Sequence, residues 1–406
     1  NHNVAVSGGS QATTFNLSLT SNKEDGILLE SGFDRKLVNF KIDHKISGKA
    51  KIGFTTRYLD QTIRGAGTTN SGTRTTNRLR HSIQYRPFAS PNVPSVDDFD
   101  EELYRTSANM TNPVLLTQAE YRRQYTKAVN LSGYFAYNLL KNLVFRSTWG
   151  FDNNNQRTDL FYNKYTNTAR NNASLPVASI AQQNSTTFNN SNTLQYTLPK
   201  FGEHAIDILA GQEIYETKAK SNSTETRYFP EDISAEKALA NMGLGSPPAG
   251  FQQPRPVSSE TPPSRIFSLF SRVNYDWNNR LLAQFTIRAD RSSKFKYDNG
   301  LLIFPSGSIA YRLIEEKMFS DIPWLSDAKI RGGFGVAGNN RIGDLLYMQL
   351  YGVTGEYALN HTILPGFEPP ALANENLKWE KTVSKSIGLD LGFLSNRIQF
   401  SADYYH

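Results

Sequence analysis

Apolar and polar residues alternate along much of the chain, most clearly in residues 265–339. In residues 272–277, Val273, Tyr275 and Trp277 share one parity, and the residues between them are polar or charged. Two asparagines then break the pattern, which resumes in the next segment. Side chains of a strand point to opposite faces with period 2. The stretch therefore predicts a β-hairpin with one apolar face and one polar face, joined by a tight turn.

The same alternation recurs from one end of the chain to the other and predicts fourteen strands. An all-β, antiparallel architecture follows, because the predicted strands succeed one another with no strong helical segment between them. The strands are expected near residues 14–20, 35–45, 50–58, 79–85, 129–137, 143–151, 187–197, 205–215, 272–277, 281–289, 308–313, 328–336, 382–391 and 397–405.

The connections between these strands are of two kinds. Short turns are expected at 46–48, 140–142, 199–204, 278–279 and 395–396, and long loops at 153–186, 216–264, 290–307 and 337–381. One short helix is expected at 234–242. Antiparallel barrels place short turns on one side and long loops on the other. The turns at 46–48 and 140–142 fit one side only if a further strand lies within 87–125, so the expected count is about 14–15.

Composition is consistent with a membrane barrel and argues against membrane-crossing helices. The chain has 406 residues, a mean hydropathy of −0.50 and 12% aromatic residues. No apolar run approaches the roughly 20 residues that a membrane helix needs. A low mean hydropathy does not exclude a membrane β-barrel, because only every second residue faces lipid. Tyr and Phe suit strands and the aromatic girdles of barrels.

The cysteine content and the distribution of charge exclude several classes of site and partner. Cysteine is absent, which excludes disulfides, thiol catalysis and most structural zinc sites. The net charge is +7, but the basic residues are spread along the chain rather than clustered. Nucleic-acid binding needs a basic patch, so we expect no nucleic-acid partner.

Four patterns that can carry chemistry are better explained by structure. Residues 333–338 fit G-x-G-x-x-G, yet their flanks predict hairpins rather than a strand followed by a helix, so we expect barrel-strand glycines and no bound nucleotide. The acidic residues at 97–102 lack the spacing of a calcium loop and suit the first turn of a helix. Ser10 is not part of a nucleophile elbow. The sequence spacing typical of metal ligands does not occur among the six histidines. They are His2, His44, His81, His204, His361 and His406. We therefore expect no catalytic, cofactor-binding or metal-ligating residues, and the substrate-binding residues stay unassigned.

Four segments carry a resemblance to a known family. Residues 3–19 read NVAVSGGSQATTFNLSL, and residues 271–295 read SRVNYDWNNRLLAQFTIRADRSSKF, followed by FPSGSIAYRL from Phe304. Residues 324–339 read WLSDAKIRGGFGVAGN, and residues 374–390 read NENLKWEKTVSKSIGLD. In this order they resemble the barrel of SusC/RagA-type TonB-dependent transporters of Gram-negative outer membranes.

The resemblance implies a 22-stranded barrel closed by an N-terminal plug and energised by the TonB–ExbB–ExbD complex through a TonB box. It also implies a SusD-like surface lipoprotein as partner and an oligosaccharide or peptide as cargo. Outer-membrane lipids would surround the barrel. The chain lacks the TonB box, the plug and the last strands of this pattern. We therefore expect residues 1–406 to be one partial barrel domain, with long extracellular loops and short periplasmic turns.

Alternative functions belong to other classes. The chain could be part of a passive porin or of an outer-membrane barrel enzyme, although no Ser/His/carboxylate set is recognisable. It could also be a soluble all-β carbohydrate-binding protein with its apolar face turned inward. The favoured interpretation is a non-enzymatic, active importer in the outer membrane.

Overall fold

Antiparallel pairing between neighbouring strands builds almost the whole molecule. The structure is a computed structural model that describes residues 1–65, 82–83, 85, 113–360, 362–369 and 371–406. Strands β1–β8, β10–β13, β16 and β17 follow one another as neighbours in a single sheet, and β9 adds a fifteenth strand beside β8. Strands β14 and β15 form a separate hairpin. The prediction of an all-β antiparallel sheet of about 14–15 strands is confirmed.

The strands differ greatly in length. Their bounds are β1 His2–Gly9, β2 Thr13–Asp25, β3 Gly32–Lys45, β4 Ala50–Arg64, β5 Glu120–Leu140, β6 Leu143–Tyr162, β7 Val177–Thr197, β8 His204–Thr226, β9 Val257–Glu260, β10 Ser264–Trp277, β11 Leu281–Ser292, β12 Leu301–Arg312, β13 Leu325–Asn339, β14 Gly352–Leu359, β15 Thr362–Glu368, β16 Glu380–Phe393 and β17 Ile398–Tyr405. The longer helices are α3 Pro113–Ala119, α4 Asn167–Arg170, α5 Ala235–Ala240 and α6 Lys317–Ser320. Among the described residues, no helix has both the length and the apolar character needed to cross a membrane.

Strand β1 and the β4–β5 pair correct the predicted strand list. Strand β1 was not predicted, and it pairs along its whole length with β2. Strand β4 pairs directly with β5, which begins at Glu120. The turns at 46–49 and 141–142 therefore lie at the same end of the sheet without the extra strand that was predicted within 87–125. The strand expected at 79–85 lies mostly outside the described residues.

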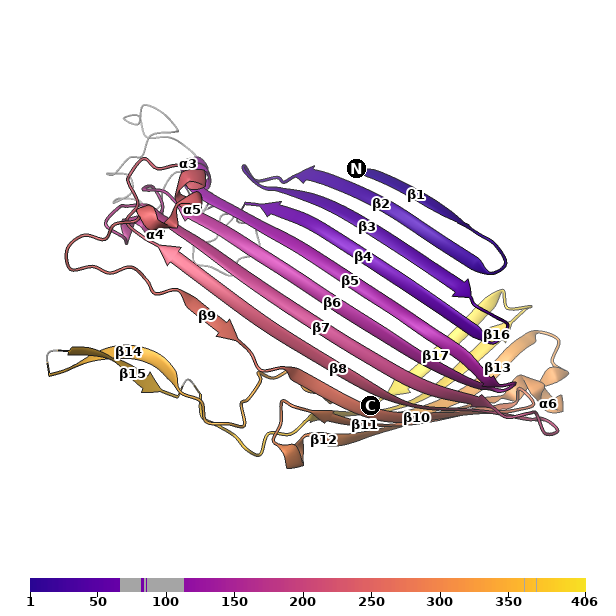
Figure 1. The fold of residues 1–406 in the computed structure, drawn as a ribbon. Coiled ribbons are helices and arrows are strands. Elements are labelled where there is room, and N and C mark those ends of the chain that lie inside the picture. Colours follow the sequence, from indigo (N-terminus) through magenta and orange to yellow (C-terminus); the bar gives the residue numbers. More distant parts are fainter. Residues whose placement is uncertain (66–81, 84, 86–112, 361, 370) are drawn as a thin grey trace.

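With this pairing, turns and loops alternate as a barrel requires. One end of the sheet is called the turn end. It carries the connections 10–12, 46–49, 141–142, 198–203, 278–280, 313–324 and 394–397. The opposite end, the loop end, carries 26–31, 65–119, 163–176, 227–263, 293–300 and 340–379. Helices α3, α4 and α5 gather at the loop end of β5–β8, whereas α6 lies at the turn end (Figure 1).

The two faces of the sheet have opposite chemistry. The register places Phe54, Phe151, Phe188 and Phe285 on one face, which we call the outward face. Its large apolar side chains are exposed and include Val4, Leu19, Ile52, Phe54, Trp149, Phe151, Phe188, Ile214, Phe267, Phe285, Ile309, Phe334, Ile387 and Phe400. Along this apolar region, the other face, the inward face, carries mainly polar and charged residues. This arrangement is the reverse of a soluble protein, whose apolar side chains pack into a core.

Strands β5–β8 continue far past this apolar band. They contain 20–23 residues, whereas β10–β13 contain 12–15. A membrane strand needs only about 9–11 residues, so these four strands form a wall above the band at the loop end (Figure 1). The loop predicted at 153–186 is therefore wrong over most of its length. Its many Asn, Gln and Thr residues suggested a loop, but cross-strand pairing between β6 and β7 holds them in the sheet.

Two small apolar clusters fix the loops to the strand ends. In the first, Phe161 of β6 and Ala178 of β7 pack against Phe229 and Ala238. Ala238 lies on α5, whose first turn is capped by Ser234 accepting a hydrogen bond from the Lys237 backbone N–H at 3.3 Å. The helix expected at 234–242 is confirmed, although α5 ends at Ala240 and a short 3-10 turn follows.

The second cluster ties the long 340–379 loop to β12. Trp379 packs against Phe295 and Phe304, with ring centroids 5.4 and 5.5 Å away, and its indole N–H donates to the Gly300 carbonyl at 2.9 Å. Strands β14 and β15 inside this loop were not predicted either. Their hairpin projects away from the sheet (Figure 1), so nothing in the alternation of the barrel strands could reveal it.

Gly338 tests the second cluster, because an added methyl group would overlap the Phe304 ring at 2.3 Å. We expect Gly338→Ala to destabilise the cluster by about 1–3 kcal/mol, the usual cost of overpacking. Limited proteolysis of the intact protein should then cut residues 340–379 faster. Gly335→Ala is the matched control, because its nearest neighbour lies at 3.7 Å. Equal proteolysis of both variants would contradict this role of the cluster.

Candidate functional site: the inward face

Charged side chains on the inward face are held in pairs. The Arg288 guanidinium on β11 donates to Asp290 at 2.7 Å, to Glu213 of β8 at 3.0 Å and to the Ser268 hydroxyl of β10 at 2.7 Å. Three strands are thus joined through one arginine. Such fixed pairs line the inward face without leaving a free charge at this point.

A second arginine plays the same part on the last strands. Arg331 of β13 donates to Asp390 of β16 at 3.0 Å and to Asp403 of β17 at 2.8 Å. Lys329 adds a further ion pair to Asp390 at 3.0 Å, and the Ser401 hydroxyl donates to the same carboxylate. The network fixes the side chains of three neighbouring strands on the inward face.

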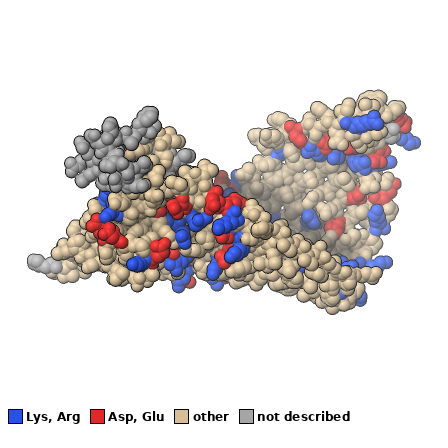
Figure 2. Space-filling view, turned by 90° about the horizontal axis from the view of Figure 1, so that it is seen from above, with Lys and Arg blue, Asp and Glu red and all other residues tan. Residues whose placement is uncertain are grey.

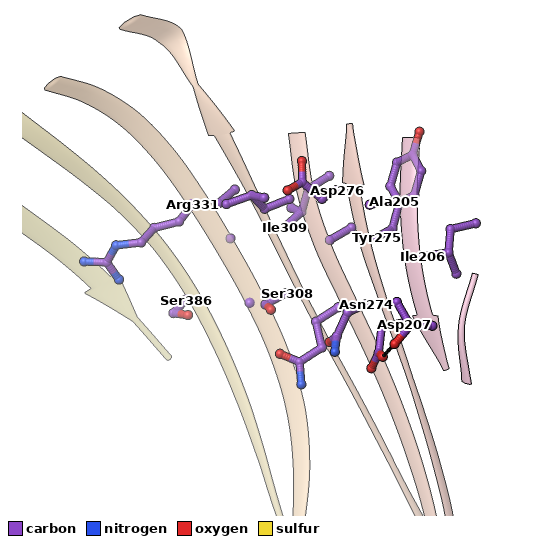
Figure 3. Close-up of a pocket in the computed structure, with 17 residues that line it drawn as sticks. Ala205, Ile206, Asp207, Asn274, Tyr275, Asp276, Ser308, Ile309, Arg331 and Ser386 are labelled. Atoms are coloured by element: carbon purple, nitrogen blue, oxygen red, sulfur yellow. Dashed lines mark hydrogen bonds between the residues drawn. The ribbon is translucent and has the colours of Figure 1, made fainter. Parts of the chain in front are cut away.

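A hollow of about 530 Å³ lies near the turn end of β8–β16. Its inward-facing lining is mostly small or polar and includes Asp207, Asn274, Gln284, Ser308 and Ser386. Figure 3 shows the Arg331 guanidinium reaching toward β16 and away from Asn274 and Asp207. Asp207 is itself engaged, since it accepts hydrogen bonds from Thr197 at 2.8 Å and Gln195 at 2.9 Å. Apart from Asp207 and Asp276, the hollow presents mainly short uncharged side chains, and the Arg331 guanidinium is bound to Asp390 and Asp403.

The inward face of the β5–β8 wall is uncharged along the rows of Asn154, Gln156 and Thr158, and its charged residues Glu120, Arg122, Asp152 and Glu225 lie outside these rows. Register pairs place Asn154 opposite Ser185 and Gln156 opposite Gln183. The Thr187 and Thr217 hydroxyls are hydrogen-bonded at 3.0 Å. Tyr215 shares this face and is 40% exposed. Amide and hydroxyl groups both donate and accept hydrogen bonds, so this wall can bind a neutral polar molecule.

The loop end carries ion pairs outside the sheet. Lys164 donates to Glu231 at 2.8 Å and to Asp232 at 3.2 Å, and these carboxylates hold the pKa of Lys164 above its ordinary value. Lys296 donates to Glu375, which raises the pKa of Lys296 and lowers that of Glu375. Lys164, Lys296 and Glu375 are therefore charged at neutral pH. Figure 2 shows basic and acidic side chains in mixed groups rather than in large patches of one sign.

The residues singled out from the sequence take structural positions. The glycines of 333–338 lie inside β13, as expected for a barrel strand. The Ser10 hydroxyl accepts from the Thr13 backbone N–H at 3.2 Å in a turn. His204 is hydrogen-bonded to the Tyr275 hydroxyl at 2.8 Å, and His44 to the Thr13 hydroxyl at 2.8 Å. The acidic residues 97–102, His81 and His361 lie outside the described residues.

No group of three metal-binding side chains occurs in the described part of the chain.

No residue was assigned to substrate binding from the sequence. The Arg288 and Arg331 networks and the uncharged wall were not predicted either. The signal was present, because these residues share the polar parity of their strands. What the sequence could not give was the register that brings them together.

Comparison with known proteins identifies the family. The family model described as "TonB dependent receptor-like, beta-barrel" matches residues 54–406. The TonB-dependent receptor SusC of Bacteroides thetaiotaomicron is 44% identical over 144 residues, which cover 34% of this chain and 14% of SusC. The TonB-dependent receptor P3 of Formosa agariphila is 26% identical over 415 residues, covering 100% of this chain and 39% of P3. These matches confirm the resemblance to SusC/RagA-type proteins.

Solved structures share the fold. The RagAB peptide transporter matches with a TM-score of 0.80 and 22% identity, covering 99% of this chain and 43% of the matched chain. The siderophore receptor PiuA of Acinetobacter baumannii matches with a TM-score of 0.53 and 11% identity, covering 99% of this chain and 54% of that chain.

The chain thus spans well under two thirds of the relatives that it matches. These relatives are receptors and transporters, which agrees with the expectation of a protein that is not an enzyme. The two-faced antiparallel sheet, the alternation of turns and loops and the family match over 54–406 together place this chain in the TonB-dependent receptor β-barrel family.

Proposed function

We propose that residues 1–406 form part of the membrane wall of an active outer-membrane importer for an oligosaccharide or a peptide. The observation that carries this proposal is the two-faced sheet, with exposed apolar side chains on the outward face and paired polar groups on the inward face. Lipid would cover the outward face. The loop end would be extracellular and the turn end periplasmic, since barrels of this kind have long outer loops and short inner turns.

The whole protein would need more than this chain. Strands β1 and β17 each pair on one side only, and unpaired backbone groups are untenable in hydrocarbon. Further strands would close the barrel, and a plug would fill it. The small polar lining of the hollow near the turn end is suited to packing against such a plug. Energy from the TonB complex and a SusD-like lipoprotein lid at the loop end would complete the importer.

Energised uptake is the property that separates this proposal from a passive porin. The test is uptake of labelled oligosaccharides by cells that carry the full-length gene, compared with cells lacking it. A protonophore, or loss of TonB, should abolish gene-dependent uptake. Gene-dependent uptake that persists under both treatments would indicate a passive pore instead.

The uncharged wall favours a neutral oligosaccharide as cargo. Asn154, Gln183 and Ser185 offer donors and acceptors to sugar hydroxyls, and exposed Tyr215 offers a ring for the apolar face of a sugar. A peptide is the second candidate, because RagAB is described as a peptide transporter. Free peptides carry charged termini, for which the uncharged rows of this wall offer no charged partner.

Tyr215 distinguishes the two cargo classes. We expect Tyr215→Ala to weaken oligosaccharide uptake about fivefold, because an aromatic contact contributes about 1 kcal/mol. Tyr215→Phe keeps the ring and should retain most of the activity. The measurement is competition between labelled oligosaccharides and peptides for uptake by the full-length protein. Loss of peptide uptake alone in Tyr215→Ala would reverse the preference.

The 246–263 segment is a candidate contact of the lid. Its residues reach back to the wall, since Gln253 accepts from the Arg227 backbone N–H at 2.9 Å and β9 pairs with residues 220–223 of β8. Simple deletion would strain the fold. Gly245 lies against Thr226, whereas Ser264 pairs with Thr217. Nine residues of strand separate these points on β8, about 30 Å.

Replacing 246–263 by a Gly/Ser linker of equal length avoids this strain. We expect less lipoprotein to co-purify with the tagged full-length protein, and weaker uptake, while the barrel still assembles. A control linker that keeps Gln253 and β9 restores both contacts to the wall and should recover lid binding. Unchanged co-purification and uptake with the full replacement would remove this segment from the lid interface.

A further inference from the structure

An ordered set of side chains lies on the outward face just above the apolar band of β5–β8. Three successive register pairs of β6 and β7 are Phe151 with Phe188, Asn153 with Thr186 and Asn155 with Asn184. All six side chains share the outward parity. From the membrane toward the loop end, the face thus changes from exposed aromatic rings to amides and a hydroxyl within four residues.

Lysines flank the amides on both sides. Lys127 of β5 is the register partner of Asn155, and Lys220 of β8 is the partner of Asn184. Lys218 is the partner of Thr186 in the row below. Because neighbouring strands lie about 4.8 Å apart, the backbones of Lys127 and Lys220 are about 14 Å apart across the row.

The polar groups between the lysines are already arranged. The Asn153 amide donates to the Thr186 hydroxyl at 3.0 Å and more weakly to the Asn184 carbonyl at 3.4 Å. These bonds order the three side chains relative to one another. Because the residues lie on the outward face, sugar hydroxyls there could pair with their remaining donors and acceptors.

The charge balance of this area is positive. Lys218 and Arg265 both donate to Glu216, so two cations share one carboxylate. Lys220 lies 3.9 Å from Glu260, and both side chains are more than half exposed. Asp60 of β4 is the other register partner of Lys127 and in turn faces Lys36 of β3, and no ion pair of Lys127 is found among the described residues. Basic side chains just above a membrane surface attract anionic lipid headgroups.

We propose that Lys127, Lys218, Lys220 and the intervening amides bind the headgroup of an outer-leaflet glycolipid with phosphates at both ends of a disaccharide. The lysines would bind the two phosphates, the amides would hydrogen-bond the sugars, and the acyl chains would lie over Phe151 and Phe188. The spacing of the lysines suits a disaccharide rather than a single phosphate group. This site presupposes the membrane orientation proposed above, but it does not depend on the cargo or on energised transport.

The test uses the full-length protein in detergent and a purified bis-phosphorylated disaccharide lipid. Binding is measured by native mass spectrometry, with the dephosphorylated lipid and inorganic phosphate as comparison probes. We expect the triple variant Lys127→Gln/Lys218→Gln/Lys220→Gln to bind the lipid about 100-fold more weakly. The matched control Lys49→Gln/Lys141→Gln/Lys200→Gln removes three exposed charges at the turn end and should bind like the wild type.

Three outcomes would overturn the site. Equal losses in the triple variant and the control would show a general charge effect. Equal binding of the dephosphorylated lipid would exclude the phosphates as the recognised groups. Displacement by equimolar inorganic phosphate would indicate a simple anion site. If the triple variant fails to assemble, Lys220→Gln alone replaces it, since that side chain is 55% exposed. Uptake assays on the same variants separate this site from the transport proposal, which fails only if the wild type does not import.

Discussion

Backbone hydrogen bonding in a medium without water is the constraint on which this structure depends. Inside hydrocarbon, each unpaired N–H or C=O costs several kcal/mol, so a β-protein can cross only when every strand has a partner. The antiparallel pairings from β1 to β17 meet that demand inside the sheet and leave only the outer edges of β1 and β17 without a neighbouring strand. Antiparallel neighbours need only short connections. The strands can therefore be joined by tight turns at one end of the sheet, while the long loops lie at the other end.

The same constraint explains what the sequence revealed. Where one face meets lipid and the other meets polar groups, apolar and polar residues alternate sharply, as in Val273, Tyr275 and Trp277 against Arg272, Asn274 and Asp276. The β10–β11 hairpin and its Asn-rich turn were therefore predictable. Asn278 and Asn279 adopt positive φ values of 49° and 55°, the left-handed conformation that a tight hairpin turn requires and that asparagine tolerates.

The failures arose where lipid no longer distinguishes the two faces. Above the apolar band, water can contact both faces of β6 and β7, so Asn153, Gln156 and Gln183 show no alternation and resembled a loop. Their strand state comes from pairing with neighbours over 20 residues, which is a tertiary property. Strand β1 was missed for a related reason, since only Val4 and Val6 mark its apolar face. The polar networks could not be assigned because one-residue errors in register exchange the two faces.

The two proposed binding sites use opposite faces of the same strands in the β5–β8 wall. On β6, the even residues Asn154 and Gln156 face inward, toward the proposed cargo, whereas the odd residues Asn153 and Asn155 face outward, toward the proposed lipid headgroup. Both faces are rich in amides, which suits hydroxyl-bearing molecules in water rather than hydrocarbon. In the proposed orientation, the alternation that separates lipid from lumen in the membrane would continue above it as a separation between two kinds of polar partner. Substitutions on one parity should leave the other face intact, since neighbouring side chains on a strand point away from each other. The many Asn, Gln and Thr residues made these strands resemble a loop in the sequence. The same side chains are the ones that would bind the two proposed ligands.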